Sequence, residues 1–204
     1  MTLTVALACE SESDLAIYRF LASAIIERPV VVWTGDTVFR GCSAVGKLAS
    51  AFLARAEAFG ICHALLAIDN DGRSKARLEH DGTHVLQTFD GADNDRCREC
   101  WLTEAAPPSW RDGAKLVVAV PVQTIETWLL CVRGTAFTTK TPEHQYDRKA
   151  LKNSFGLKGL PEAERIRLAM AELEKDTALA TLRTRASFRR FEARLAAWRS
   201  APLA

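Results

Sequence analysis

Four short runs of apolar residues alternate with longer segments in which apolar residues recur every three to four positions. The runs cover residues 3–9, 30–33, 63–68 and 115–122. An uninterrupted apolar run of this length is typical of a strand that is covered on both faces, as in a parallel sheet. Segments 14–27 and 47–59 have the spacing of amphipathic helices, and the polar stretch 34–46 between them indicates a loop.

This alternation of strand and helix predicts an α/β fold with a mainly parallel sheet flanked by helices. We assign residues 1–133 to this domain, 134–146 to a linker and 147–204 to a basic helical C-terminal extension. Thr124 and Ser187 are suited to cap the helices that follow them. Within the polar stretch 73–114, a short helix near 73–80 and a strand near 84–89 are weaker features.

The chain carries a net charge of only +2, but the charge is unevenly distributed. Residues 1–136 contain 13 Lys and Arg against 17 Asp and Glu, whereas residues 137–204 contain 14 against 8. An acidic body with a basic end is compatible with a metal site in one part and a polyanion in the other. The basic part includes a cluster of five arginines: Arg183, Arg185, Arg189, Arg190 and Arg194. These arginines either bind the backbone of DNA or RNA or form the solvated face of amphipathic helices.

Targeting signals and disulfides are not expected. The first residues lack the basic segment of a secretory signal, and no apolar run reaches the ~20 residues of a membrane helix. Three of the six cysteines lie in apolar settings, which is typical of free cysteine packed in a core. We therefore expect a cytoplasmic protein without a disulfide framework and without a membrane partner.

Acidic residues follow three of the four apolar runs. Glu10 closes the first, Asp69 and Asp71 close the third, and Glu126 begins the helix after the fourth. Because the carboxyl ends of parallel strands meet at one edge of a sheet, we expect these side chains to converge. Carboxylate oxygens suit Mg²⁺ or Mn²⁺, and such an ion activates water and neutralises charge on a phosphoryl group.

Each of these acids also has a simpler interpretation. Asp69 and Asp71 belong to a DNDG sequence with good turn chemistry. Glu10 and Asp14 are placed to stabilise the start of a helix through its dipole. Glu12 is a weaker candidate for a ligand of a second metal ion.

The pattern resembles the TOPRIM (topoisomerase–primase) domain, a Rossmann-like family with a glutamate after its first strand and a DxD motif after its third. ALACESESD places Glu10 at the glutamate, with Ser11 where many members have glycine, and Asp69 and Asp71 match the DxD. VPVQTIETWLL followed by a basic tail containing SFRRF is similar to small stand-alone TOPRIM-like proteins and to the TOPRIM half of OLD-family nucleases. The resemblance adds Glu126 as a further ligand. It implies Mg²⁺-dependent cleavage of DNA or RNA, in DNA repair or phage defence.

Two other functions remain open. A TOPRIM-like domain is also compatible with a non-catalytic subunit that uses metal to bind nucleic acid or a nucleotide beside a partner protein. LLAIDNDGR also resembles the DxDG motif of haloacid-dehalogenase-type phosphatases, in which the first aspartate is the nucleophile.

Two further motifs supply candidate ligands. Gly41 to Lys47 fit most of a phosphate-binding loop, but Leu48 stands where the hydroxyl residue is needed. We retain Lys47 as a phosphate ligand from a loop, together with Lys149 and Lys152. The ligand types and spacings of a tetrahedral zinc site occur at His80, His84, Cys97 and Cys100.

Overall fold

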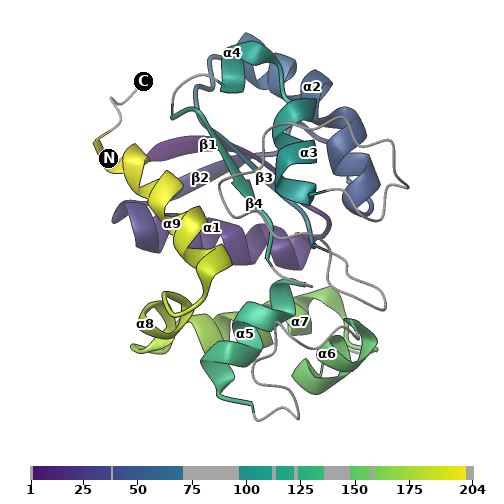
Figure 1. Ribbon diagram of the computed structural model, residues 1–204, viewed down its shortest axis with the longest axis vertical. Coiled ribbons are helices and arrows are strands. Elements are labelled where there is room, and N and C mark those ends of the chain that lie inside the picture. Colours follow the sequence, from purple (N-terminus) through teal and green to yellow (C-terminus); the bar gives the residue numbers. More distant parts are fainter. Residues whose placement is uncertain are drawn as a thin grey trace.

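A single parallel sheet forms the centre of the protein, whose computed structural model describes residues 2–37, 39–70, 97–111, 114–121, 124–135, 148–156 and 159–200 (Figure 1). Within these residues, four strands pair in the order β2-β1-β3-β4. They are β1 (Leu3–Ala8), β2 (Val30–Trp33), β3 (Ala64–Ala67) and β4 (Leu116–Ala119). Each strand lies within one of the predicted apolar runs, and every pairing is parallel, so the predicted α/β class is confirmed.

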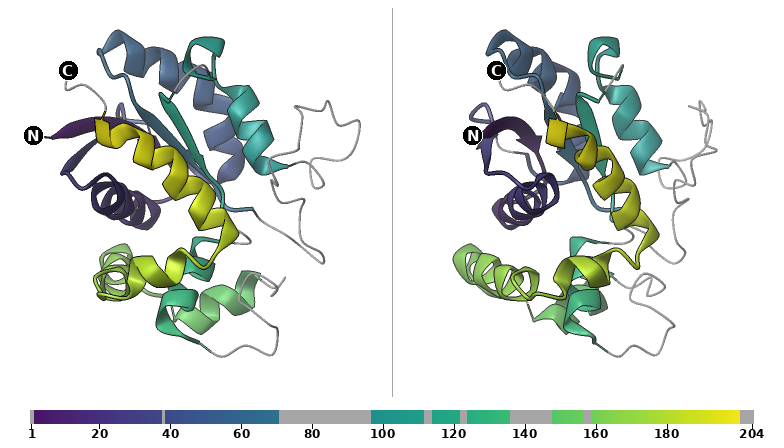
Figure 2. Two further views of the ribbon diagram at one scale, coloured as in Figure 1. Left: turned by 60° about the vertical axis from the view of Figure 1, so that its left-hand side comes forward. Right: turned by 90° about the vertical axis from the view of Figure 1, so that its left-hand side faces the viewer.

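Helices cover both faces of the sheet at its central strands, which explains why β1 and β3 are apolar with little alternation, whereas Val31 of the edge strand β2 is 49% exposed. In β1, Val5 and Leu7 belong to one hydrophobic cluster, whereas Ala6 and Ala8 belong to another on the opposite face. The helices α1 (Glu12–Ile26) and α9 (Ala186–Ala196) cover the first face. The helices α2 (Cys42–Ala58) and α3 (Arg98–Ala105) cover the second (Figure 2).

The remaining helices gather mainly at one end of the sheet. Four of them lie there together (Figure 1): α5 (Ile125–Arg133), α6 (Arg148–Phe155), α7 (Glu162–Leu173) and α8 (Ala178–Leu182). A short helix, α4 (Pro108–Arg111), precedes β4, and a 3₁₀ turn over Ala197–Ser200 follows α9. Phe188 and Trp198 are fully buried in the same cluster as Val5 and Leu7, so the C-terminal helices share a core with the sheet.

Two helices begin earlier than the sequence predicts. Helix α1 starts at Glu12 because the Ser11 side chain accepts a hydrogen bond from the Asp14 backbone N–H at 3.2 Å. Helix α2 starts at Cys42, so the prediction of a loop as far as residue 46 was wrong. Gly46 lies inside this helix against α3, where an added Cβ would come within 2.0 Å of the Trp101 ring. The glycine therefore serves close helix packing.

Other differences concern helices that the sequence did not predict and the start of the last helix. Helices α3 and α4 form within a stretch for which the sequence predicted no regular elements near 98–111. The last helix begins at Ala186, ahead of Ser187, and the Ser187 hydroxyl instead accepts a hydrogen bond from Trp128 Nε1 at 3.0 Å. The elements expected near 73–80 and 84–89, and most of the expected linker 134–146, lie outside the described residues.

Among the described segments, no helix combines the length and the apolar character needed to cross a membrane.

Candidate functional site

The candidate site lies at the point of the sheet where the order of the strands changes direction. The chain passes from β1 to β2 on one side and then crosses back to place β3 on the other side of β1. In open parallel sheets, ligands bind beyond the carboxyl ends of the strands at such a crossover. Glu10 follows β1 and Asp69 follows β3, and the Asp69 backbone N–H donates to Glu10 Oε1 at 2.9 Å. The two acids are thus joined across this crevice.

Asp69 also fixes the start of α5. Its Oδ1 atom accepts a hydrogen bond from the Ile125 backbone N–H at 2.9 Å. Thr124 occupies the N-cap position, but in the described structure its side chain makes no capping bond, so the prediction that Thr124 caps this helix was wrong. Asp69 instead accepts the hydrogen bond of the Ile125 N–H, which has no partner within the helix. The positive end of the helix also stabilises the Asp69 carboxylate.

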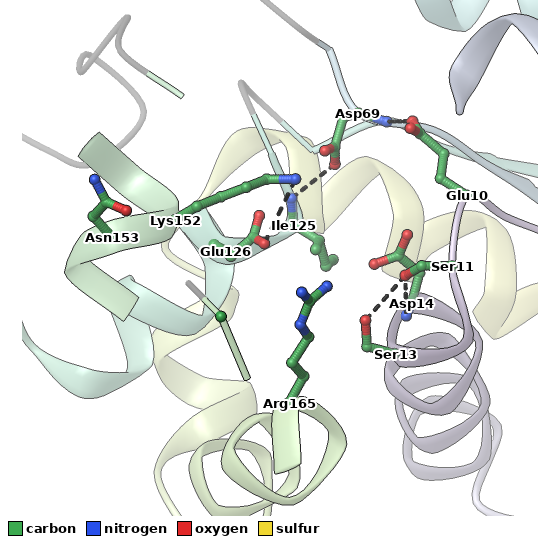
Figure 3. Close-up of a pocket in the computed structure, with 11 residues that line it drawn as sticks. Glu10, Ser11, Ser13, Asp14, Asp69, Ile125, Glu126, Lys152, Asn153 and Arg165 are labelled. Atoms are coloured by element: carbon green, nitrogen blue, oxygen red, sulfur yellow. Dashed lines mark hydrogen bonds and ion pairs between the residues drawn. The ribbon is translucent and has the colours of Figure 1, made fainter. Parts of the chain in front are cut away.

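A pocket of about 590 Å³ opens beside these residues. Its described lining contains four carboxylates from the strand ends and the starts of α1 and α5, and two cationic side chains from α6 and α7 (Figure 3). The carboxylates are Glu10, Asp14, Asp69 and Glu126, and the cations are Lys152 and Arg165. The acidic groups come from the strand ends, α1 and α5, and the cations from the C-terminal helices, so the pocket depends on both parts of the chain.

Glu126 is the least exposed of the four carboxylates. It is only 5% exposed, and Lys152 Nζ lies 3.9 Å from its Oε1 atom. Among the described residues, the buried Oε2 atom of Glu126 has no hydrogen-bond partner. Because an unpaired buried oxygen of a carboxylate is costly, this atom marks a position suited to a cation or a hydrogen-bond donor.

Burial and crowding raise the pKa values of two acidic side chains in the pocket. Burial, followed by repulsion from Glu126 and Glu10, raises the pKa of Asp14 to about 7. Burial and the same two neighbours raise the pKa of Asp69 well above its usual range. The nearby Lys152 lowers both pKa values, but its effect is smaller than those of burial and repulsion. The protein therefore holds acidic groups together at a cost in stability, as functional sites often do.

The structure brings four of the sequence-predicted residues into this pocket: Glu10, Asp69, Glu126 and Lys152. Asp71 lies outside the described residues. Lys149 lies in the first turn of α6. Lys47 is exposed on α2 and is not among the described residues that line the pocket.

The predicted arginine cluster lies on and before α9, away from the lining of the pocket. Arg183 pairs with Glu192 at 2.7 Å. Arg194 and Arg190 approach the buried Glu99 of α3 at 2.6 and 3.6 Å. The two remaining members are Arg185 and Arg189. Because three of the five arginines contact carboxylates of the protein itself, part of their charge stabilises the packing of α9 on α3, and their binding of nucleic acid stays a prediction.

The candidate zinc residues are only partly described. Cys97 precedes α3, Cys100 lies within it, and both are buried, whereas His80 and His84 lie outside the described residues. In the part of the chain that the structure describes, no three His, Cys, Asp or Glu side chains lie close enough together to hold a metal ion.

Sequence reasoning missed two residues of the pocket. Asp14 was interpreted only as a partner of the helix dipole, yet its position in the first turn after Glu10 places it at the same edge of the sheet. That position is a signal that the sequence contained. Arg165 lies on α7, and no local pattern distinguishes it from the other basic residues of the extension.

Comparison with known proteins leaves the family open. No protein-family model matches the chain, and no curated protein or solved structure shows significant similarity to it.

The raised pKa of Asp14 predicts a pH-dependent stability. Between about pH 4 and pH 7 the folded protein keeps the Asp14 proton and the unfolded chain does not, so the free energy of unfolding falls as pH rises. Asp14→Asn removes this penalty. Its stabilisation should be absent near pH 4, grow up to pH 7 and then level off at a few kcal/mol, because a tenfold change in acidity corresponds to about 1.4 kcal/mol.

Urea unfolding at a series of pH values without divalent cations measures this difference. Asp176→Asn is the matched control because Asp176 is exposed in the turn between α7 and α8. A stabilisation by Asp14→Asn that did not vary with pH would contradict the expectation.

Proposed function

We propose that the protein is a Mg²⁺- or Mn²⁺-dependent phosphodiesterase that cleaves nucleic acid. The observation that carries the proposal is the convergence of Glu10, Asp69 and Glu126 on one pocket at the crossover of a parallel sheet. The same pocket contains two cationic side chains, which suit the phosphate of a substrate. The proposal also rests on the resemblance of ALACESESD and the DxD motif to TOPRIM nucleases.

The types of donor in the pocket suit a hard divalent cation, but among the described residues no three acidic side chains lie close enough together to hold one ion. The available donors are carboxylate oxygens, which Mg²⁺ and Mn²⁺ prefer. Burial, and after it repulsion from Glu126 and Glu10, raises the pKa values of Asp14 and Asp69, and a bound divalent cation would offset both effects. The buried Oε2 atom of Glu126, which lacks a hydrogen-bond partner among the described residues, adds an oxygen suited to a cation.

Each residue has a distinct role in the proposal. Glu10, Asp69 and Glu126 would supply the metal ligands, with Asp71 as a further ligand that the sequence suggests. Because no three acidic side chains of the described residues lie close enough together for one ion, metal binding requires them to move closer. The bound cation would supply charge neutralisation and an acidified water molecule. Lys152 would bind the phosphate, and Asp69 would keep the start of α5 at the site through its bond to Ile125. In the reaction a water oxygen bonds to phosphorus, the bond from phosphorus to the leaving sugar oxygen breaks, and that oxygen takes a proton.

Cleavage assays on the full chain test this proposal. Labelled single-stranded DNA, duplex DNA and RNA are incubated with Mg²⁺, Mn²⁺ or a chelator, and we expect cleavage only with a metal present. Glu10→Gln should lower the rate by at least about a hundredfold, since even residues that only orient metal ligands are worth 10–100-fold. Its amide oxygen can still accept from the Asp69 N–H, so the local fold is kept. Glu57→Gln, an exposed carboxylate on α2, is the control.

The other outcomes identify the alternative functions. Salt-sensitive binding without cleavage of any substrate would favour the non-catalytic binding subunit, whose support is that Glu10 and Asp69 already accept backbone hydrogen bonds. Metal-dependent hydrolysis of a small phosphate monoester, without cleavage of nucleic acid, would favour the phosphatase. The absence of both binding and hydrolysis would contradict all three.

A further inference from the structure

Arg165 reaches the candidate site from the C-terminal helices. Its Nε atom donates to the Leu160 carbonyl at 3.0 Å, and its Nη1 atom lies 3.6 Å from Glu162 Oε2. Figure 3 shows its guanidinium directed into the pocket, between the carboxylates of Glu126 and Asp14. An arginine has five N–H donors, so donors remain for a ligand after these two contacts.

The position of Arg165 is fixed by a contact between two helix starts. Glu162, in the first turn of α7, accepts a hydrogen bond from the Ser13 backbone N–H at 2.6 Å. Ser13 lies in the first turn of α1, three residues after Glu10. The bond therefore ties the start of α7 to the strand end that carries Glu10. A side chain held in this way is preorganised, which favours its use in binding.

Arg165 and Lys152 bring two cationic groups among the carboxylates of the pocket, and the Lys152 ammonium lies beside Glu126 (Figure 3). Lys152 lies on α6 and Arg165 on α7, and their side chains are 44% and 38% exposed. A planar guanidinium matches two oxygens of a phosphate, and an ammonium adds a point charge.

The size of the pocket limits which form of nucleic acid can place a phosphate in it. Its volume of about 590 Å³ falls within the roughly 300–1,000 Å³ of pockets that hold one small ligand. Helix α6 with Lys152 lies on one side of the pocket and α1 with Asp14 on the other, while α7 with Arg165 packs next to α1 (Figure 3). One extended strand can place a nucleotide between these two sides. A duplex holds its two backbones apart around stacked pairs and is too wide for the pocket.

We propose that Arg165 and Lys152 form a phosphate clamp supplied by the C-terminal helices, and that this clamp admits a single unpaired strand of nucleic acid and excludes a duplex. The inference rests on the proposed function, because it names the form of substrate for the same site. It assigns the discrimination between single and paired strands to side chains of α6 and α7.

Equilibrium binding tests the clamp without any cleavage. The full chain is titrated, in a chelator, against fluorescent single-stranded DNA, single-stranded RNA of the same sequence, and the blunt DNA duplex. We expect wild type to bind a single strand at least about tenfold more tightly than the duplex. Arg165→Gln should lower single-strand affinity by about tenfold or more, as expected for lost hydrogen bonds to a charged group. The slope of the logarithm of affinity against the logarithm of salt concentration should fall by about one, the contribution of one phosphate contact.

Arg167→Gln is the matched control, because Arg167 lies on the same helix and pairs with the exposed Glu164 at 2.5 Å. Lys152→Gln should also weaken binding, and Arg165→Lys should restore part of the affinity, since lysine keeps the charge but not the planar fork. Thermal midpoints of all variants check that the fold is kept.

Two binding results would overturn the clamp: equal affinity for single strand and duplex, or wild-type affinity in Arg165→Gln. Weak binding to every probe would overturn it as well. These outcomes are separate from failure of the proposed function. A protein that binds single strands through Arg165 but cleaves nothing refutes the nuclease alone, and a nuclease that binds and cuts duplex equally well refutes the clamp alone.

Discussion

Asp69→Asn is expected to make the protein more stable and inactive at the same time. Asp69 is 9% exposed, and burial together with Glu126 and Glu10 raises its pKa well above its usual range. Replacing a repelled carboxylate by a neutral amide of the same shape removes the repulsion. The amide oxygen can still accept from the Ile125 N–H, so the start of α5 stays capped.

The loss of activity has a separate cause. An amide is a weaker ligand than a carboxylate for a hard cation and leaves the charge of the metal less compensated. We expect metal-dependent cleavage to fall by at least about a hundredfold, since groups that merely orient ligands are worth 10–100-fold. Opposite changes in stability and activity distinguish a functional carboxylate from a structural one.

Thermal unfolding at pH 8 and cleavage assays measure the two effects. In a chelator, the midpoint of Asp69→Asn should lie above that of wild type. Added Mn²⁺ should raise the wild-type midpoint, because a ligand that binds the folded state stabilises it, and should leave the variant unchanged. Asp176→Asn should match wild type in both assays. A lower midpoint for Asp69→Asn without metal would show that the pocket favours the carboxylate, contrary to its raised pKa.

Trp128→Ala is expected to cause the largest loss of stability. Trp128 is 1% exposed on α5, and its ring lies 5.1 Å from the Phe188 ring and 5.6 Å from the Phe191 ring, centroid to centroid. Its Nε1 atom donates to Ser187 Oγ at 3.0 Å. Truncation removes these contacts and leaves a cavity, which costs about 3–5 kcal/mol for a buried tryptophan.

The position of Trp128 links this loss to the candidate site. Trp128 lies two residues after Glu126 on the same short helix, so a loosened α5 also displaces that carboxylate. Urea unfolding measures the free energy, and Trp128→Phe is the control because it keeps an aromatic ring and loses the hydrogen bond to Ser187. The control should lose markedly less than the alanine variant. A cost below about 1 kcal/mol for Trp128→Ala would show that α5 and α9 do not belong to one cooperative core.

The sheet was predictable because its central strands, β1 and β3, are buried on both faces. Burial of that kind requires continuous apolar runs, and the runs at 3–9 and 63–68 contain β1 and β3. The convergence of Glu10, Asp69 and Glu126 followed from the rule that parallel strands end at one edge. Local sequence and one fold rule were therefore sufficient to locate the acidic side of the pocket.

The other side of the pocket was not predictable in the same way. Arg165 enters the pocket through the contact between Glu162 and Ser13, which joins segments that are distant in the chain. Outside the pocket, the loop predicted as far as Gly46 was wrong for a similar reason, because the approach of Trp101 from α3 requires a glycine inside α2. Tertiary packing decides such contacts, and no periodicity in the sequence records them.

The parallel arrangement of the sheet also has a consequence for how the chain folds. Each pairing between the described strands spans at least one whole helix, so none can close as a local hairpin. The entropy of closing such long loops is lost before the contacts form, and folding of this topology is therefore slow. During that delay the apolar strands remain open to other chains, which makes dilute refolding conditions or chaperones important for recovering the protein from denaturant.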